Sequence, residues 1–224
     1  MGWSEWIRTV EIEPSLYAGD FSRLGEQLDV LLEAGTRIFH FDVGDGHFVE
    51  PITVGPIVIE SIRDRVHRRG GVFDCHLMVD NPERHIPQIA RAGGDSVTFH
   101  VEVTEDVGGV IALAREHGLG AGVAFNPGTS VEAAAEAAPD ADIVLCMSIW
   151  PGYSGQAFMP DAPARIARLR ELLPEKPIQV DGGIGPDTIG AARDAGATLF
   201  VAGTAVFGRE DIARAYSELV QQVA

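Results

Sequence analysis

The sequence predicts an α/β protein that folds as a single (β/α)8 barrel, known as a TIM barrel, over residues 1–224. Short apolar runs alternate with longer amphipathic runs along the whole chain, and eight such pairs fit into its 224 residues. Each strand–helix unit then has about 28 residues, close to the minimum for this barrel. No linker or low-complexity segment interrupts the pattern, so one domain is expected. A doubly wound open sheet is the alternative, but it usually contains fewer units.

The expected strands are short apolar runs bounded by turn residues. They cover residues 10–15, 37–43, 72–78, 96–100, 120–125, 143–147, 177–181 and 198–202. The expected helices are the amphipathic runs between them, several of which end at a glycine that can terminate a helix. They cover residues 21–34, 56–66, 82–92, 107–117, 131–138, 162–173, 186–195 and 211–223.

Composition restricts the functions that this chain can perform. Hydrophobic residues make up 46% of it, too many for a disordered protein. The formal net charge of −16 argues against nucleic acids and anionic membranes as partners, because both require clustered Lys and Arg. No run approaches the roughly 18 apolar residues of a membrane span. The chain start lacks the pattern of a signal peptide, so a cytoplasmic protein is expected.

Polar residues occupy strand positions that a barrel normally fills with apolar side chains. The alternation of strand side chains places His40 and Asp42 on one face, and His76 and Asp181 on the corresponding faces of two other strands. All of them lie near carboxyl ends of strands, where barrel active sites are found. Imidazole and carboxylate groups of this kind suit a divalent metal ion. A buried ion-paired network without metal is the alternative reading.

Glycine-rich turns follow the last three expected strands, at residues 151–156, 182–183 and 203–204. The loops after strands seven and eight are the usual phosphate site of a barrel. No Lys or Arg lies within these turns, so backbone N–H groups are expected to bind the anion. Alternatively, these glycines serve only to make tight turns.

Six motifs in order resemble the ribulose-phosphate 3-epimerase family over nearly the whole chain. They are Glu-Pro-Ser-Leu (13–16), His-Phe-Asp-Val-Gly-Asp-Gly-His-Phe-Val (40–49), Asp-Cys-His-Leu-Met (74–78), Met-Ser-Ile-Trp-Pro-Gly-Tyr-Ser-Gly-Gln (147–156), Val-Asp-Gly-Gly-Ile (180–184) and Val-Ala-Gly-Thr-Ala-Val-Phe (201–207).

The resemblance implies an isomerase that inverts C3 of a ketose phosphate through an enediolate, with D-ribulose 5-phosphate and D-xylulose 5-phosphate as the default pair. It implies one divalent ion per chain, with zinc as the first candidate, and the imidazole and carboxylate donors would also suit manganese, iron or cobalt. His40, Asp42, His76 and Asp181 correspond to the metal ligands of that family. Asp42 and Asp181 also correspond to its acid and base. A homo-oligomer, dimeric or hexameric, is implied as well.

Ten residues correspond to the family's substrate-binding positions. They are Ser15, His76, Met78, Met147, Gly152, Gly155, Gly182, Gly183, Gly203 and Thr204. Three alternatives remain open for the function. The first is epimerisation of another ketose phosphate, such as allulose 6-phosphate or a tetrulose phosphate. The second is an aldose–ketose isomerisation through the same enediol, and the third is a barrel that binds sugar phosphate without catalysis.

The chain departs from the family pattern at Tyr17, Gly44, Glu50 and Trp150. Gly44 replaces a methionine on the same strand face as Asp42, so space is expected to open there. Tyr17 and Trp150 are expected to fill part of that space and to alter the preference for the sugar. Elsewhere, residues 3 and 6 are tryptophans near the chain start, which predicts either a cover for the bottom of the barrel or an oligomer contact.

Overall fold

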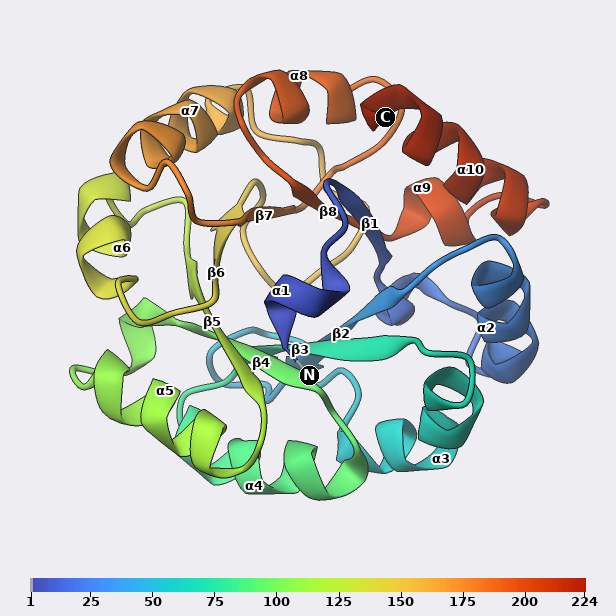
Figure 1. Cartoon of the computed structure of the whole chain (residues 1–224), viewed down its shortest axis with the longest axis horizontal. Helices are drawn as coiled ribbons and strands as arrows, with labels where there is room; N and C mark the ends of the chain where they lie inside the picture. Colours follow the sequence, from blue (N-terminus) through green and yellow to red (C-terminus); the bar gives the residue numbers. More distant parts are fainter. Residues whose placement is uncertain (1) are drawn as a thin grey trace.

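The computed structural model describes residues 2–224 and contains one sheet of eight parallel strands. Their order is β1-β8-β7-β6-β5-β4-β3-β2, and a parallel bridge between Ser15 and His40 joins β1 to β2, so the sheet closes into a barrel (Figure 1). The strands are β1 (Glu11–Pro14), β2 (Ile38–Gly44), β3 (Val72–Met78), β4 (Ser96–His100), β5 (Gly120–Phe125), β6 (Ile143–Met147), β7 (Ile178–Asp181) and β8 (Leu199–Ala202). The predicted fold class is confirmed.

Helices surround the barrel on its outside (Figure 1). They are α2 (Leu24–Glu33), α3 (Pro56–His67), α4 (Pro82–Ala92), α5 (Val107–Glu116), α6 (Val131–Ala137), α7 (Ala162–Leu172), α8 (Ile189–Asp194) and α10 (Ile212–Val223). Each corresponds to an expected helix, with its ends displaced by a few residues. Four short elements were not expected: α1 (Trp3–Trp6), α9 (Thr204–Phe207) and the 3-10 turns η1 (Leu16–Ala18) and η2 (Val101–Val103). Within residues 2–224, the structure contains no helix with the length and apolar character needed to cross a membrane.

The main hydrophobic core lies between the barrel and its helices. Phe39 and Phe41 of β2, Phe73 of β3, Phe99 of β4 and Phe200 of β8 are fully buried there. Along β2, Phe39 and Phe41 alternate with His40 and Asp42, which point into the barrel instead. The alternation predicted for this strand therefore directs its aromatic side chains to the hydrophobic core and its polar side chains to the barrel interior.

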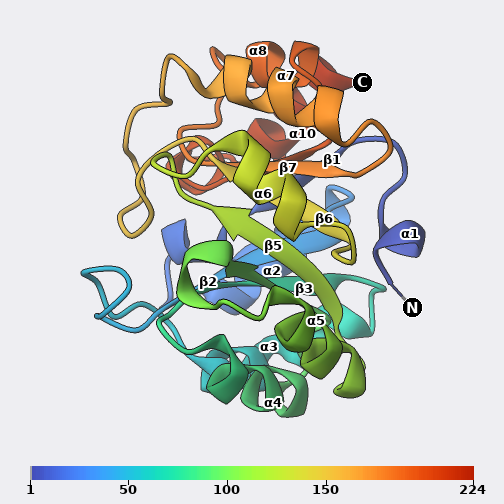
Figure 2. The same ribbon diagram turned by 90° about the vertical axis from the view of Figure 1, so that its left-hand side faces the viewer.

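A small apolar cluster fills one end of the barrel. Trp3 and Trp6 of α1 pack edge-to-face, with ring centroids 5.4 Å apart, on Ile38, Ile143 and Leu199 at the starts of three strands. Figure 1 shows α1 over the centre of the barrel, and Figure 2 shows it at the end opposite the loops that follow β2 and β6. Because both indoles are buried within their own chain, they cover the bottom of the barrel.

Candidate active site

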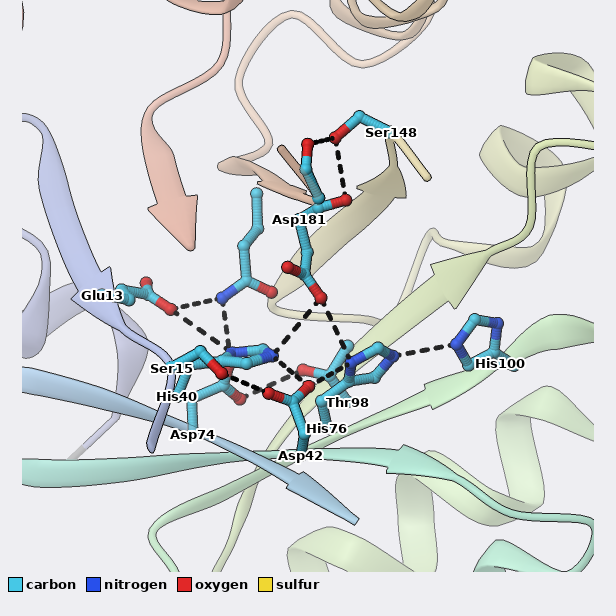
Figure 3. A network of polar contacts seen from close by, with 12 residues as sticks. Glu13, Ser15, His40, Asp42, Asp74, His76, Thr98, His100, Ser148 and Asp181 are labelled. Carbon is cyan, nitrogen blue, oxygen red and sulfur yellow. Dashed lines mark hydrogen bonds and ion pairs between the residues drawn. The ribbon is translucent and has the colours of Figure 1, made fainter. Parts of the chain in front are cut away.

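Three strands bring four polar side chains together inside the opposite end of the barrel (Figure 3). The register of β2 and β3 pairs Asp42 with His76, and β7 contributes Asp181. One potential ligand atom from each of His40, Asp42, His76 and Asp181 lies within 4.8 Å of the others. Asp42 Oδ1 is 3.3 Å from His40 Nε2 and 3.2 Å from His76 Nδ1. The four residues predicted as metal ligands therefore do form one cluster, which we call the acidic cluster.

The hydrogen bonds of His40 leave one of its nitrogens free for a cation. His40 Nδ1 lies 3.1 Å from Asp74 Oδ2, while the buried Nε2 has no hydrogen-bond partner. If Nδ1 donates to Asp74, the lone pair of Nε2 faces Asp42 and Asp181. A histidine ligand whose other nitrogen is held by a carboxylate is a recurrent feature of metal sites.

Charge in the barrel interior also favours a cation. Glu13, Asp42 and Asp74 are buried, and the side chain of Asp181 is only 16% exposed. No Lys or Arg is among the buried residues of the chain from position 2 onward. Buried carboxylates need a partner, because water no longer solvates them. Nitrogen and oxygen donors without a thiolate fit a divalent ion, so the residues present fit the predicted metal.

Neighbouring charges shift the two aspartates of the cluster in opposite directions. Burial and repulsion by Asp42 raise the pKa of Asp181 to about 7. Burial opposes ionisation of Asp42 as well, but contacts with His40 and His76 outweigh it and lower the pKa of Asp42. Burial lowers the pKa of His40, yet the adjacent Asp42 and Asp74 carboxylates raise it well above its usual value. The site thus attracts positive charge, supplied by a proton on His40 or by a cation bound to it.

A pocket opens above the acidic cluster, at the carboxyl ends of the strands. Its wall contains Asp42, Asp181 and every predicted substrate-binding residue except His76. His76 is fully buried, so in this structure it belongs to the cluster rather than to the pocket wall. The complete lining is Ser15, Tyr17, Asp42, Met78, Met147, Ile149, Pro151, Gly152, Tyr153, Ser154, Gly155, Asp181, Gly182, Gly183, Ile184, Val201, Gly203 and Thr204.

Ser15 links the wall of the pocket to the cluster. It follows β1, and its hydroxyl donates a hydrogen bond of 2.5 Å to Asp42 Oδ2. The other carboxylate oxygen of Asp42 faces His40 and His76. Asp42 is therefore fixed in orientation from both sides.

The glycine turns lie on the other side of the pocket, and side-chain hydrogen bonds hold them in place. Ser148 donates to the carbonyl oxygens of Asp181 and Gly182, at 2.8 Å and 2.7 Å (Figure 3). Gln156 Nε2 donates to two carbonyls of the loop that precedes it. Gly203 comes immediately before α9, so the first N–H groups of that short helix lie at the pocket.

The departures from the family pattern have unequal consequences. Tyr17 lines the pocket, whereas Trp150 lies outside it and is 54% exposed. The expectation of open space at Gly44 is wrong. A Cβ there would lie 2.8 Å from Val49 Cγ2 and 2.9 Å from the carbonyl oxygen of Pro51, because the loop after β2 folds back over this position. Glu50, which follows Val49 in that loop, does not line the pocket.

Sequence reasoning missed two acids near the cluster. Glu13 is fully buried beside His40, where burial and repulsion by Asp74 raise its pKa to about 7. Its strand position, two residues before Ser15, was a signal that could have placed it inside the barrel. Glu102 contacts His100 at 3.3 Å. It lies beyond the end of β4, in a 3-10 turn, where strand alternation makes no prediction.

Polar side chains and glycine-rich turns at the carboxyl ends of the strands are typical of barrel enzymes that act on phosphorylated small molecules. The ribulose-phosphate 3 epimerase family matches residues 11–207 of this chain. A ribulose-phosphate 3-epimerase of Schizosaccharomyces pombe is 43% identical over 197 residues, 88% of this chain and 86% of that protein. The enzyme of the same name from Escherichia coli is 37% identical over 217 residues, 95% of this chain and 96% of that protein. The chain belongs to the ribulose-phosphate 3-epimerase family, which confirms the prediction of an isomerase that acts on a carbohydrate phosphate.

Solved structures share the fold at low sequence identity. KGPDC from Streptococcus mutans superimposes with a TM-score of 0.73 at 13% identity, covering 96% of this chain and 98% of that chain. The 3-hexulose-6-phosphate synthase from Salmonella typhimurium gives a TM-score of 0.69 at 19% identity, covering 95% and 98%. Both support the barrel fold alone.

Proposed function

We propose that this protein interconverts D-ribulose 5-phosphate and D-xylulose 5-phosphate by inverting C3. The observation that carries the proposal is that two aspartates and the glycine-rich turns line the same pocket. Asp42 and Asp181 face the same pocket as the turns that contain Gly155, Gly182 and Gly203. One side can therefore exchange protons with the sugar while the other side binds its phosphate.

Inversion at C3 requires one group to remove a proton and a second group to return one to the opposite face. The C3 proton is acidic because the C2 ketone accepts the electron pair, which gives an enediolate. Asp42 and Asp181 come from strands β2 and β7, on different sides of the barrel, so each can serve one face of C3. The aspartate that starts ionised takes the proton, and the aspartate that starts protonated supplies one. In the reverse direction the two exchange roles.

The surroundings of the two aspartates suit these roles. Ser15 holds Asp42 in one orientation, as a positioned base requires. A pKa of Asp181 near 7 allows this carboxyl to carry a proton at neutral pH. Two close, poorly solvated carboxyls would be unfavourable in a protein that only binds sugar phosphates. The pair therefore favours catalysis over the non-catalytic alternative.

We further propose that His40 Nε2, Asp42, His76 Nδ1 and Asp181 hold one divalent ion, with zinc as the first candidate. A bound divalent ion would stabilise the negative charge that develops on the oxygens of C2 and C3. The unpartnered His40 Nε2 and the uncompensated carboxylates support this assignment.

The phosphate is proposed to bind the backbone N–H groups of the turns at Gly155, 182–183 and 203–204. The residues that line the pocket include no Lys or Arg. In a chain of net charge −16, local N–H dipoles then have to attract the phosphate dianion against the overall field. Met78 and Met147 supply apolar surface between the two sides.

The test is an assay of the full-length chain in deuterium oxide with D-ribulose 5-phosphate. We expect D-xylulose 5-phosphate to form with deuterium at C3, and activity to disappear with chelator and return with zinc, manganese or cobalt. Parallel assays with tetrulose and hexulose phosphates test the alternative substrates. Absence of C3 exchange with every ketose phosphate would refute epimerisation at C3, and exchange at C1 instead would favour the aldose–ketose isomerisation. Full activity without metal would refute only the metal proposal.

We also propose a homo-oligomer, a dimer or hexamer as the resemblance implies, that acts in the cytoplasm, as the name of the rice relative, a cytoplasmic isoform, suggests for that protein. Ile52 and Ile57 are 82% and 76% exposed, so they are candidates for a contact between subunits. Light scattering of the full-length chain measures the oligomeric state, and a monomer at micromolar concentration would contradict this part of the proposal.

A further inference from the structure

A line of polar contacts leads from the acidic cluster to a carboxylate beyond β4. His76 Nε2 lies 2.8 Å from His100 Nε2 (Figure 3), and His100 Nδ1 lies 3.3 Å from Glu102 Oε2. The two rings meet end to end, with centroids 5.0 Å apart and planes inclined by 25°. The proton between them therefore lies close to both ring planes. Neither His100 nor Glu102 has a role in the mechanism described above.

The direction of these hydrogen bonds follows from the carboxylate at the end of the line. Burial opposes ionisation of Glu102, but hydrogen bonds from His100, Thr129 and Asn126 outweigh it and lower its pKa to about 2. An ionised carboxylate only accepts, so His100 Nδ1 must donate. A neutral imidazole carries one N–H, and His100 Nε2 is then an acceptor. His76 must donate to it from Nε2.

This direction leaves His76 Nδ1 without a proton. That nitrogen is 3.2 Å from Asp42 Oδ1 and 3.7 Å from Asp181 Oδ2. With the opposite direction, Nδ1 would carry the proton and donate to Asp42, and the bare Nδ1 of His100 would face the charged Glu102. In that contact the lone pairs of His100 Nδ1 and of the Glu102 carboxylate would repel each other with no cation between them. The lone pairs of His76 Nδ1 and Asp42 instead face the position of the proposed divalent ion, which would attract both.

We propose that Glu102, acting through His100, is a positioning residue that holds the proton of His76 on Nε2 and keeps the Nδ1 lone pair directed into the acidic cluster. The proposal deepens the metal site of the proposed function and rests on it. Asp74 acts on His40 from the other side of the cluster, by a direct contact. Each histidine of the cluster thus has its own carboxylate: Asp74 contacts His40 directly, and Glu102 acts on His76 through His100.

The substitution Glu102→Gln should reverse the direction of each hydrogen bond between position 102 and His76 while keeping the shape of the side chain. Glu102 Oε1 accepts a 2.7 Å hydrogen bond from the backbone N–H of Asn126 and another from the Thr129 hydroxyl. A backbone N–H can only donate, so in Glu102→Gln the amide oxygen must remain on this side. The amide nitrogen then replaces Oε2 and donates to His100 Nδ1. His100 must in turn donate from Nε2, and His76 must carry its proton on Nδ1.

The experiment compares the wild type with Glu102→Gln and, as a control for the lost charge, with the exposed Glu105→Gln. Long-range proton–nitrogen NMR of the histidine rings in the full-length chain reports which nitrogen carries the proton. Zinc affinity is measured by competition with a chromophoric chelator. We expect His100 to change from an Nδ1–H to an Nε2–H tautomer in Glu102→Gln, and zinc affinity to fall about 10- to 100-fold. Glu105→Gln should change neither.

Two results would overturn the proposal. One is a wild-type spectrum with the His100 proton on Nε2, a measurement that needs no variant and is independent of how variants fold. The other is a reversed tautomer in Glu102→Gln combined with wild-type zinc affinity. If the wild type binds no zinc, manganese or cobalt, the metal site of the proposed function is wrong. The ring spectra then still decide whether Glu102 sets the proton of His76.

Discussion

The two sides of the pocket are built from different kinds of groups, even where, as at Asp181 and Gly182, they are neighbours in the chain. On one side, the acidic cluster consists of side chains that project from the strands β2, β3 and β7. On the other side, the turns of Gly155, 182–183 and 203–204 present main chain; we call this side the glycine wall. The two sides are sensitive to different substitutions. The acidic cluster depends on which chemical groups are present, whereas the glycine wall depends on how closely backbone segments can pack.

Under the proposed function, the difference matches the two ends of a sugar phosphate. The carbon that changes configuration needs groups that take up and release protons, which side chains supply. The phosphate needs N–H groups pointing at a fixed anion, which backbone supplies without adding a cation. In the acidic cluster, substitutions that keep the shape of a side chain but change its chemical group should therefore lower activity. In the glycine wall, substitutions that add only an apolar group should lower the unfolding free energy, because the added volume prevents close packing.

The largest effect is expected in the acidic cluster. Asp42→Asn and Asp181→Asn keep the size of the side chain but remove the carboxyl group that we propose to exchange the proton, so each should lower kcat by about 10²- to 10⁴-fold. The double variant should lose little more than either single one, because the two groups act as a unit. Kinetics with metal content measured on the same samples test this, and the exposed Asp187→Asn serves as control. Near-normal kcat in either variant with its metal retained would contradict the two-acid mechanism.

The glycine wall should respond most strongly at Gly183. A Cβ there would lie 2.4 Å from the backbone nitrogen of Phe158, and φ is +65°. A left-handed conformation costs about 1–2 kcal/mol and overpacking about 1–3 kcal/mol, so Gly183→Ala should lose about 2 kcal/mol or more of unfolding free energy. Gly203→Ala has a φ of −92° and a nearest contact of 3.3 Å to Ala18 Cβ, so it should lose less than half as much. Denaturant unfolding compares them, and equal losses would refute the distinction.

The link between Ser15 and Asp42 should give an intermediate effect. Ser15→Ala removes the donor to Asp42 Oδ2 and leaves the shape of the pocket nearly unchanged. Hydrogen bonds to charged groups contribute about 1.5–3 kcal/mol, so kcat should fall about 10- to 100-fold. The exposed Ser61→Ala, which removes a hydroxyl on α3, is the matched control. If Ser15→Ala alters KM alone, Ser15 contacts the substrate and does not position Asp42.

The smallest effect is expected at the departures from the family pattern. Tyr17→Phe removes a hydroxyl from the pocket wall, so kcat/KM should change about 2- to 10-fold, by different factors for pentulose and hexulose phosphates. Trp150→Phe changes a side chain outside the pocket and should leave the ratio of kcat/KM for pentulose phosphate to kcat/KM for hexulose phosphate unaltered. The measurement is kcat/KM for both sugars in all three proteins. The same ratio in all of them would mean that Tyr17 does not select the sugar.

Much of the acidic cluster could be predicted because strand alternation is a local property. The aromatic residues of β2 and the polar residues between them already assign each side chain to one face of the strand. Parallel strands then bring His40, Asp42, His76 and Asp181 to the same end of the barrel. The glycine turns were predictable for a similar reason, since each directly follows a recognisable strand.

Other features depended on contacts between residues far apart in the chain, which no local pattern describes. The loop around Val49 fills the space that Gly44 was expected to open, and the barrel bottom buries Trp3 and Trp6. Glu102 reaches the cluster only through His100, from a turn where alternation has ended. The sequence by itself determined which strand faces carry the chemistry, because the two-residue repeat follows from backbone geometry alone. Only the tertiary structure decided which space is filled and which groups the buried histidines contact, because both depend on atoms that long-range packing brings together.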